Sequence, residues 1–164
     1  PPPLSVSLRR RSRIDSDGTP FTSLSVKDAM AVRNDPRLVD FDVGAVLDIA
    51  REATDDAVFI CAEFTREEFN VVYASAETVD RYDDVADMEA VGERLHDYIN
   101  LDFVERGMFE ELLPPASETH AFVTHTDYVT VARVLADQNE GVYLSFRPET
   151  DVSMVIDRVA EFLG

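Results

Sequence analysis

The residues best suited to metal or acid–base chemistry lie in one short stretch of the sequence: Glu118, His120, His125 and Asp127. Imidazole and carboxylate groups bind zinc and other first-row metals when several of them converge on the ion. In a regular strand, however, residues 120 and 125 have opposite parity and point to opposite faces of the sheet. A bulge or an early turn would reverse that. We therefore predict structural roles for these side chains and assign no metal ligand, with a metal or acid–base site as the alternative.

Few other side chains in the sequence could take part in catalysis or bind a cofactor. Cys61 lies in the apolar run Val58–Ala62, where a thiol is expected to be buried and inert. His96 is expected on the surface of a helix, and acidic pairs such as Glu67–Glu68 are expected to be solvated. The sequence has no Gly-x-Ser-x-Gly elbow, no closely spaced glycines to cradle a phosphate, and a single lysine, Lys27. We predict no catalytic residue, no cofactor-binding residue and no cofactor.

The charge of the chain is strongly one-sided. It carries 33 acidic and 15 basic residues, a formal net charge of −18, and Lys27 is its one lysine among arginines. Such a chain repels itself in dilute buffer, whereas molar salt shortens the Debye length to about 3 Å and screens the repulsion. The composition resembles that of haloarchaeal cytoplasmic proteins, and we expect a halophilic, cytoplasmic protein.

The same charge argues against nucleic acid as a partner. Phosphate binding needs clustered Lys and Arg, and the one dense cluster is Arg9, Arg10, Arg11 and Arg13. It lies in a stretch rich in Pro and Ser, so residues 1–23 are predicted to form a disordered N-terminal tail; a weak electrostatic arm is the alternative. The sequence contains no apolar run of about 18 residues, so no membrane span is expected.

The elements of the first half are predicted from spacing and capping residues. Ser25 and Asp28 weakly favour a short helix to about Arg33. Asp42 can cap a helix that ends before Asp55. Residues 58–64 and 69–74 are predicted to form a hairpin whose first strand is covered on both faces.

The second half begins with helices and ends with a run of strands. Ser75 can cap a short helix to about residue 82, and a longer helix starts at Val85. Its apolar residues Met88, Val91, Leu95 and Tyr98 are expected in the core. A following helical piece from about Phe103 is expected to be interrupted by Gly107 and to end at Pro114. Strands are predicted over 119–125, 128–135 and 142–147, followed by an amphipathic helix over 152–163.

This order predicts an α+β fold over residues 24–164: a single domain with a five-stranded, mainly antiparallel sheet flanked by helices, in the order α-β-β-α-α-β-β-β-α. Over about residues 42–163 the chain resembles roadblock- and profilin-like domains, on its element order and segments such as Gly141–Phe146. It also resembles small, acidic haloarchaeal proteins. GAF and PAS sensors are more distant relatives in topology.

The resemblance implies a non-enzymatic regulatory or protein-interaction domain whose partner is another protein or a second copy, as a homodimer. A GAF- or PAS-like sensor of small molecules is the alternative. It would need an apolar pocket between the sheet and the central helices, for which Tyr73, Leu95 and Tyr143 are the candidate lining residues. An enzyme would have to rest on the region around His120 and His125.

Overall fold

The computed structural model describes residues 31–113 and 118–164. The predicted tail over 1–23 therefore lies outside the described residues, as do Ser25, Asp28 and Pro114. The described elements are β1 (Val32–Arg33), α2 (Val43–Ala53), β2 (Val58–Thr65), β3 (Phe69–Ala74), α3 (Ala76–Val79), α4 (Val85–Leu112), β4 (Ala121–His125), β5 (Thr130–Leu135), β6 (Glu140–Phe146) and α5 (Ser153–Leu163). From α2 onward this is the predicted order of helices and strands.

All the strands join one antiparallel sheet in the order β1-β3-β2-β6-β5-β4. The α+β class with a single antiparallel sheet is confirmed, although the sheet has six strands and not the five predicted. The additional strand is β1, whose Val32 and Arg33 pair with Ala74 and Tyr73 where the sequence predicted the end of a helix. The Arg33 guanidinium also lies 5.1 Å from the centre of the Tyr73 ring, a cation–π contact that holds β1 to the sheet edge.

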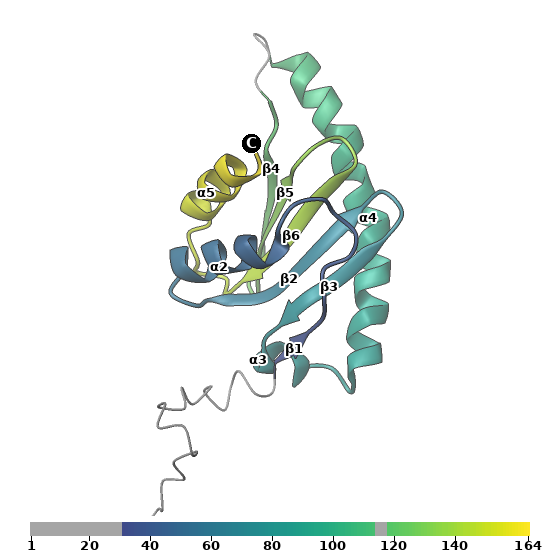
Figure 1. Cartoon of the computed structure of the whole chain (residues 1–164), viewed down its shortest axis with the longest axis vertical. Coiled ribbons are helices and arrows are strands. Elements are labelled where there is room, and N and C mark those ends of the chain that lie inside the picture. Colours follow the sequence, from purple (N-terminus) through teal and green to yellow (C-terminus); the bar gives the residue numbers. More distant parts are fainter. Residues whose placement is uncertain (1–30, 114–117) are drawn as a thin grey trace, which may run out of the picture.

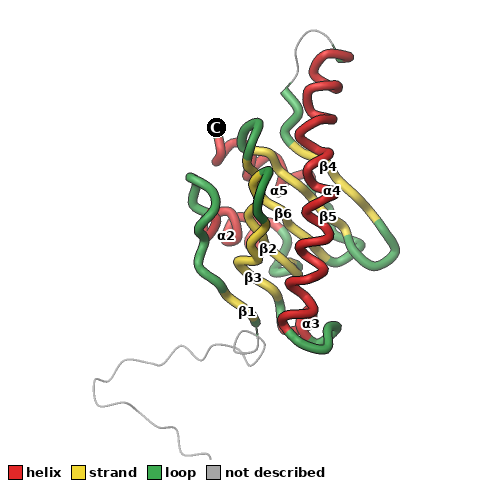
Figure 2. Tube along the Cα trace, turned by 90° about the vertical axis from the view of Figure 1, so that its right-hand side faces the viewer, coloured by secondary structure: helices red, strands yellow, loops and turns green. Residues whose placement is uncertain are grey.

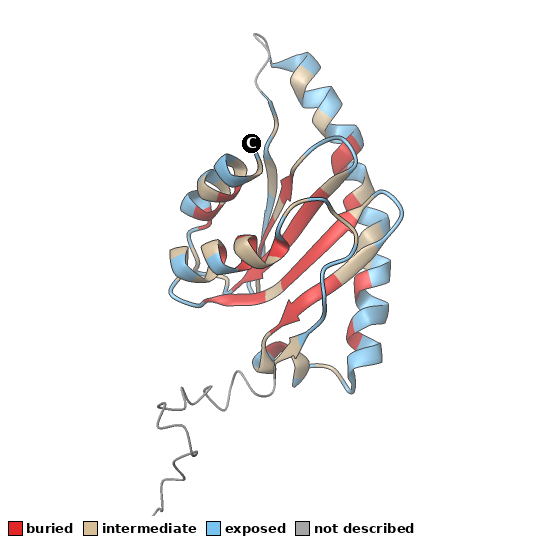
Figure 3. Cartoon of the chain, viewed as in Figure 1, coloured by how far each residue is buried: buried red, intermediate tan, exposed pale blue. Residues whose placement is uncertain are grey.

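Helices cover both faces of the sheet (Figures 1 and 2), so the molecule has three layers. Helices α2 and α5 pack on one face, over a core that includes Val142, Leu144 and Phe146 of β6. Helix α4 packs on the other face, where Tyr143 belongs to a second core cluster. The central strands are therefore buried on both sides, as predicted for residues 58–64, and the buried residues gather in the middle of the sheet (Figure 3).

Polar side chains cap the helices; Asp42 and Ser75 do so as the sequence predicts, and Asp84 is a cap that was not predicted. The side chain of Asp42 accepts a hydrogen bond from the Ala45 amide, that of Ser75 from the Thr78 amide, and that of Asp84 from the Asp87 amide, each capping a helix. The hairpin between β2 and β3 turns without glycine because Thr65 Oγ1 accepts from the amides of Glu67 and Glu68.

One charged side chain is fully buried in the sheet. Glu63 of β2 accepts hydrogen bonds from the backbone amides of Arg37, Leu38 and Val39, at 2.6, 3.1 and 3.3 Å, and from Asn70 Nδ2 at 2.6 Å. The carboxylate thus holds the segment that leads into α2 against the interior strand β2.

Helix α4 differs from its prediction in two ways. It runs unbroken through Gly107 over 28 residues, since one glycine costs only about 1 kcal/mol in a helix. Its inward side also differs from the predicted stripe: Met88 is buried and Leu95 partly buried, but Val91 and Tyr98 are exposed. The residues that face the core are Met88, Gly92, Ile99, Asp102 and Phe103. Among the described residues, no helix is long and apolar enough to cross a membrane.

Candidate interaction surface and adjoining pocket

The outer side of α4 is apolar although it faces solvent. The side chains of this surface, called here the α4 apolar face, are 55–71 % exposed. They are Tyr98, Leu101, Val104, Met108 and Leu112. Figure 3 shows most of the outer side of α4 as exposed, and in Figures 1 and 2 its C-terminal end rises beyond the sheet. A single exposed apolar side chain is common on protein surfaces, but a continuous row of them is typical of a binding surface.

Helical geometry places this row away from the core. At about 100° per residue, its members fall within roughly a third of the helix circumference, centred nearly opposite the residues that face the sheet. Tyr98 lies at the margin of the row nearest the sheet. The same side carries Arg94 and Glu105, both exposed. Residues 91, 94, 98, 101, 105, 108 and 112 follow the 3-4 spacing of a helix-pairing seam, with Arg94 and Glu105 as its charged members.

A second unpartnered feature lies beside α4. Strand β4 forms one edge of the sheet, and its outer backbone groups pair with no strand among residues 31–113 and 118–164. Phe122 of β4 and Phe109 of α4 are in contact, with ring centres 6.1 Å apart. The open strand edge and the α4 apolar face therefore adjoin, and a partner could contact both.

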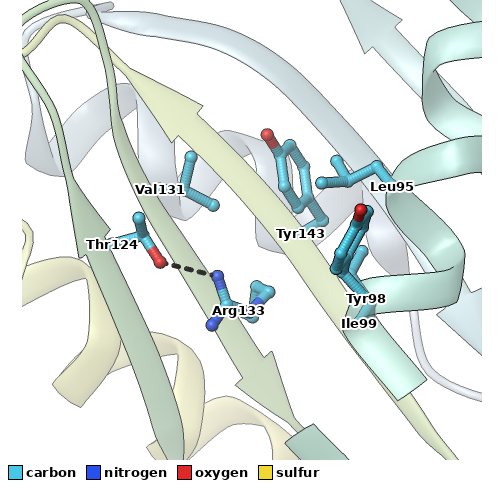
Figure 4. Close-up of a pocket in the computed structure, with 7 residues that line it drawn as sticks. All are labelled: Leu95, Tyr98, Ile99, Thr124, Val131, Arg133 and Tyr143. Carbon is cyan, nitrogen blue, oxygen red and sulfur yellow. Dashed lines mark hydrogen bonds between the residues drawn. The ribbon is translucent and has the colours of Figure 1, made fainter. Parts of the chain in front are cut away.

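A pocket of about 310 Å³ lies between α4 and the β4–β6 part of the sheet (Figure 4). Helix α4 contributes Leu95, Tyr98 and Ile99 to its wall, and the strands contribute Thr124, Val131, Arg133 and Tyr143. Two of the three lining residues predicted from the sequence, Leu95 and Tyr143, are present. Tyr73 is not, because its ring packs on the α2 side of the sheet, where the guanidinium groups of Arg33 and Arg51 lie over it.

The polar wall of the pocket is an ion pair. Arg133 Nε and Nη2 donate to the carboxylate of Asp102, a buried residue of α4, and Arg133 Nη1 donates to Thr124 Oγ1 at 2.9 Å. Burial raises the pKa of Asp102, and the guanidinium opposes that rise. Burial likewise raises the pKa of Tyr143 to about 12, so its hydroxyl stays protonated. Arg133 thus links α4 to the edge strand β4.

The side chains of the histidine region do not converge as metal ligands. His125 Nδ1 hydrogen-bonds to Thr130 Oγ1 at 2.8 Å, and the backbone oxygen of His120 accepts from the Leu135 amide. Glu118 and Asp127 lie before and after β4. All four residues are described, and no group of three or more His, Cys, Asp or Glu side chains in the described ranges is arranged to hold a metal.

Cys61 and His96 are the other singled-out residues. Cys61 is fully buried, and burial raises the pKa of its thiol far above the ordinary value, as expected of an unreactive cysteine. His96 is only partly exposed, so its prediction as a surface residue is wrong in part. Its Nε2 hydrogen-bonds to the backbone oxygen of Thr65 at 2.8 Å, which ties α4 to the β2–β3 turn.

The residues that matter most for these two features were not predicted from the sequence. Val104, Met108 and Leu112 were expected in a separate helical piece interrupted by Gly107, and neither Asp102 nor Arg133 was singled out. The 3-4 spacing over residues 91–112 could have indicated one continuous apolar row, because the spacing continues through Gly107 without a change of phase.

Comparisons with known proteins give likenesses in structure alone. No model of a known protein family matches the chain, and no curated protein matches it. Among solved structures, it is similar to the gliding protein MglB of Thermus thermophilus, with 13% identity over 79% of this chain and 94% of that one and a TM-score of 0.49. It is also similar to Myxococcus xanthus MglB, with 12% identity over 77% and 89% and a TM-score of 0.47.

A third similar structure is described as MglB with a tetrameric arrangement; it shares 13% identity over 79% of this chain and 97% of that one, with a TM-score of 0.47. These overlays are loose. The fold therefore rests on the strand order and helix placement of this chain.

Proposed function

We propose that the chain is a non-enzymatic, roadblock-like regulatory or protein-interaction domain that acts as a homodimer. The observation that carries this proposal is the α4 apolar face, five exposed apolar side chains in one row on a helix whose opposite side packs on the sheet. Burying such a row removes apolar surface from water at about 25 cal/mol per Å². The open edge of β4 beside it supplies backbone donors and acceptors for the same partner.

The spacing of charges on α4 favours a second copy as that partner. In an antiparallel helix pair related by a two-fold axis between residues 99 and 100, Tyr98 of one copy lies opposite Leu101 of the other. The same register places Arg94 opposite Glu105, so the two charged seam positions meet as an ion pair, twice by symmetry. An antiparallel pairing of two β4 edges is compatible with a two-fold axis as well.

Charge reversal on α4 tests both the self-association and its register. Arg94→Glu and Glu105→Arg each place like charges opposite one another, and each is expected to weaken the dimer by about tenfold, the effect of 1.4 kcal/mol. The double variant Arg94→Glu/Glu105→Arg restores the pairing and is expected to recover the dimer. The measurement is sedimentation equilibrium in molar KCl.

Arg158→Glu serves as the control, because Arg158 lies on α5 in the opposite layer and its exposed ion pair with Glu52 contributes little. A wild-type chain that stays monomeric at all concentrations would rule out the homodimer. A double variant that dimerises no more tightly than the single variants would rule out the antiparallel register.

The cellular setting is part of the proposal. The net charge of −18 and the near absence of lysine support a protein of salt-rich cytoplasm. The same charge makes nucleic acid an unfavourable partner. The small-molecule sensor remains the second prediction, supported by the pocket that Leu95 and Tyr143 line.

A further inference from the structure

We infer that the pocket beneath α4 is a binding site for a small, uncharged molecule with an aromatic or compact apolar body and one hydrogen-bond acceptor, such as a carbonyl oxygen. Its volume of about 310 Å³ is at the lower end of the range of ligand pockets. The site shares Tyr98 with the seam of the proposed self-association, but its other lining residues lie outside that seam.

The apolar part of the ligand is specified by the walls. Leu95 and Ile99 of α4 and Val131 of β5 provide aliphatic surface, and the rings of Tyr98 and Tyr143 flank the opening between helix and sheet (Figure 4). The Tyr143 ring is fixed by an edge contact with Phe69, with ring centres 5.8 Å apart. A flat apolar body can therefore lie between α4 and the strands without displacing a core residue.

The acceptor is specified by Arg133. Its guanidinium has five N–H bonds, of which three point to Asp102 and Thr124. The remaining two have no acceptor among the residues that the structure describes. The Arg133 side chain is 18 % exposed at the pocket wall, so a ligand oxygen can reach it.

The charge of the ligand follows from the ion pair. Asp102 already neutralises Arg133, and Glu105 adds to the negative potential at Asp102. A carboxylate ligand would place a second anion on one guanidinium, and a cationic ligand would face that guanidinium directly. Desolvating either charge in a half-buried pocket is unfavourable without a full partner. An uncharged acceptor avoids both costs.

A series of ligands with one common ring tests this assignment. Methyl NMR of the full chain in molar KCl would follow Leu95, Ile99 and Val131 during titration with acetophenone, benzoate, benzylammonium and toluene. We expect acetophenone to shift these three methyl signals. Each of the other compounds is expected to bind at least about tenfold more weakly. No shift with acetophenone, or equal binding of benzoate, would overturn the inference.

A variant that fills the pocket supplies the second arm. Leu95→Phe extends a partly buried side chain into the space and is expected to leave the melting temperature unchanged or raised while abolishing acetophenone binding. Met154→Phe, an exposed position on α5, is the matched control and should bind as the wild type does. Binding that survives Leu95→Phe would place the ligand elsewhere. Arg94→Glu should still bind, which separates this site from the homodimer.

Discussion

A carboxylate removed from water needs a donor for each of its oxygen atoms, and Glu63 finds them in a distant part of the chain. Its partners are three consecutive backbone amides, Arg37 to Val39, and the side chain of Asn70. In the sequence, Glu63 stands only as a lone charge in a buried strand. Its partners could not be identified there, because backbone amides of a loop leave no pattern in the sequence.

Replacing Glu63 with alanine is therefore expected to be costly. Glu63→Ala leaves up to four partly buried donors without this acceptor, and hydrogen bonds to a charged group contribute about 1.5–3 kcal/mol each at most. We expect the free energy of unfolding to fall by about 3 kcal/mol or more, measured by urea denaturation. Glu68→Ala, whose exposed ion pair with Arg37 lies at the same hairpin, should cost less than about 1 kcal/mol. Equal losses in both variants would contradict this account.

The Asp102–Arg133 pair gives a prediction for pH. Arg133→Met leaves the buried Asp102 carboxylate without its cation and is expected to cost about 3–5 kcal/mol at neutral pH. The folded-state pKa of Asp102 is already raised by burial, and losing Arg133 raises it further. The native state then takes up a proton before the unfolded state does, so the penalty is present above the folded-state pKa and falls as the pH drops through it.

Unfolding curves of Arg133→Met and the wild type should therefore converge as the pH is lowered from neutrality through the raised folded-state pKa of Asp102. Thr124→Val removes one hydrogen bond of Arg133 but keeps the charge pair, and its smaller loss should not depend on pH. A difference between Arg133→Met and the wild type that stays constant over this range would show that Asp102 is not the source of the loss.

Two glycines in different elements are expected to respond to alanine with opposite signs. A Cβ on Gly141 of β6 would lie 2.6 Å from the backbone oxygen of Val134 and 2.7 Å from Phe64 Cζ, whereas one on Gly107 of α4 would meet nothing within 4 Å. Gly141→Ala should lower the free energy of unfolding by about 1–3 kcal/mol through overpacking. Gly107→Ala should raise it by up to about 1 kcal/mol through helix propensity. Thermal melts followed by circular dichroism distinguish the two variants. A change of melting temperature in the same direction for both variants would contradict this prediction.

At the scale of elements, most of the fold could be predicted from the sequence because its signals are local. Asp42 and Ser75 cap helices where predicted, and the alternation of β6 places Val142 and Tyr143 on opposite faces as predicted. Strand β1 was missed because two residues carry too little pattern, and its position depends on pairing with β3.

The candidate surface was harder to predict, for a physical reason. Apolar residues occur on both sides of α4, so periodicity alone does not say which side faces the sheet. Placing Met88, Leu95 and Tyr98 on one inward stripe was a reasonable prediction, but tertiary packing selected Ile99 and Phe103 and left Tyr98 outside. The pocket could be predicted only in part, since the pair between Asp102 and Arg133 joins residues 31 positions apart.

For the whole molecule, the net charge of −18 makes stability depend on salt. Raising KCl from 0.1 M to 1 M shortens the Debye length from about 10 Å to about 3 Å and screens repulsion among the exposed carboxylates. The melting temperature should rise by several degrees or more across this range, measured by circular dichroism. The variant Glu89→Gln/Glu93→Gln/Asp97→Asn, which neutralises exposed carboxylates of α4, should show a smaller rise. A melt independent of salt would exclude the halophilic interpretation.

The two edges of the sheet are unlike one another. Beyond β3, the two-residue strand β1 and Asn34, whose amide donates to the Val72 oxygen, occupy part of one edge, whereas no strand of the described residues pairs with the outer side of the five-residue strand β4. Each copy thus offers one long edge and one very short edge to further strands. Two copies that join through β4, as proposed, leave only the short edges outward, so adding protein is expected to increase the number of dimers and not the length of a fibre.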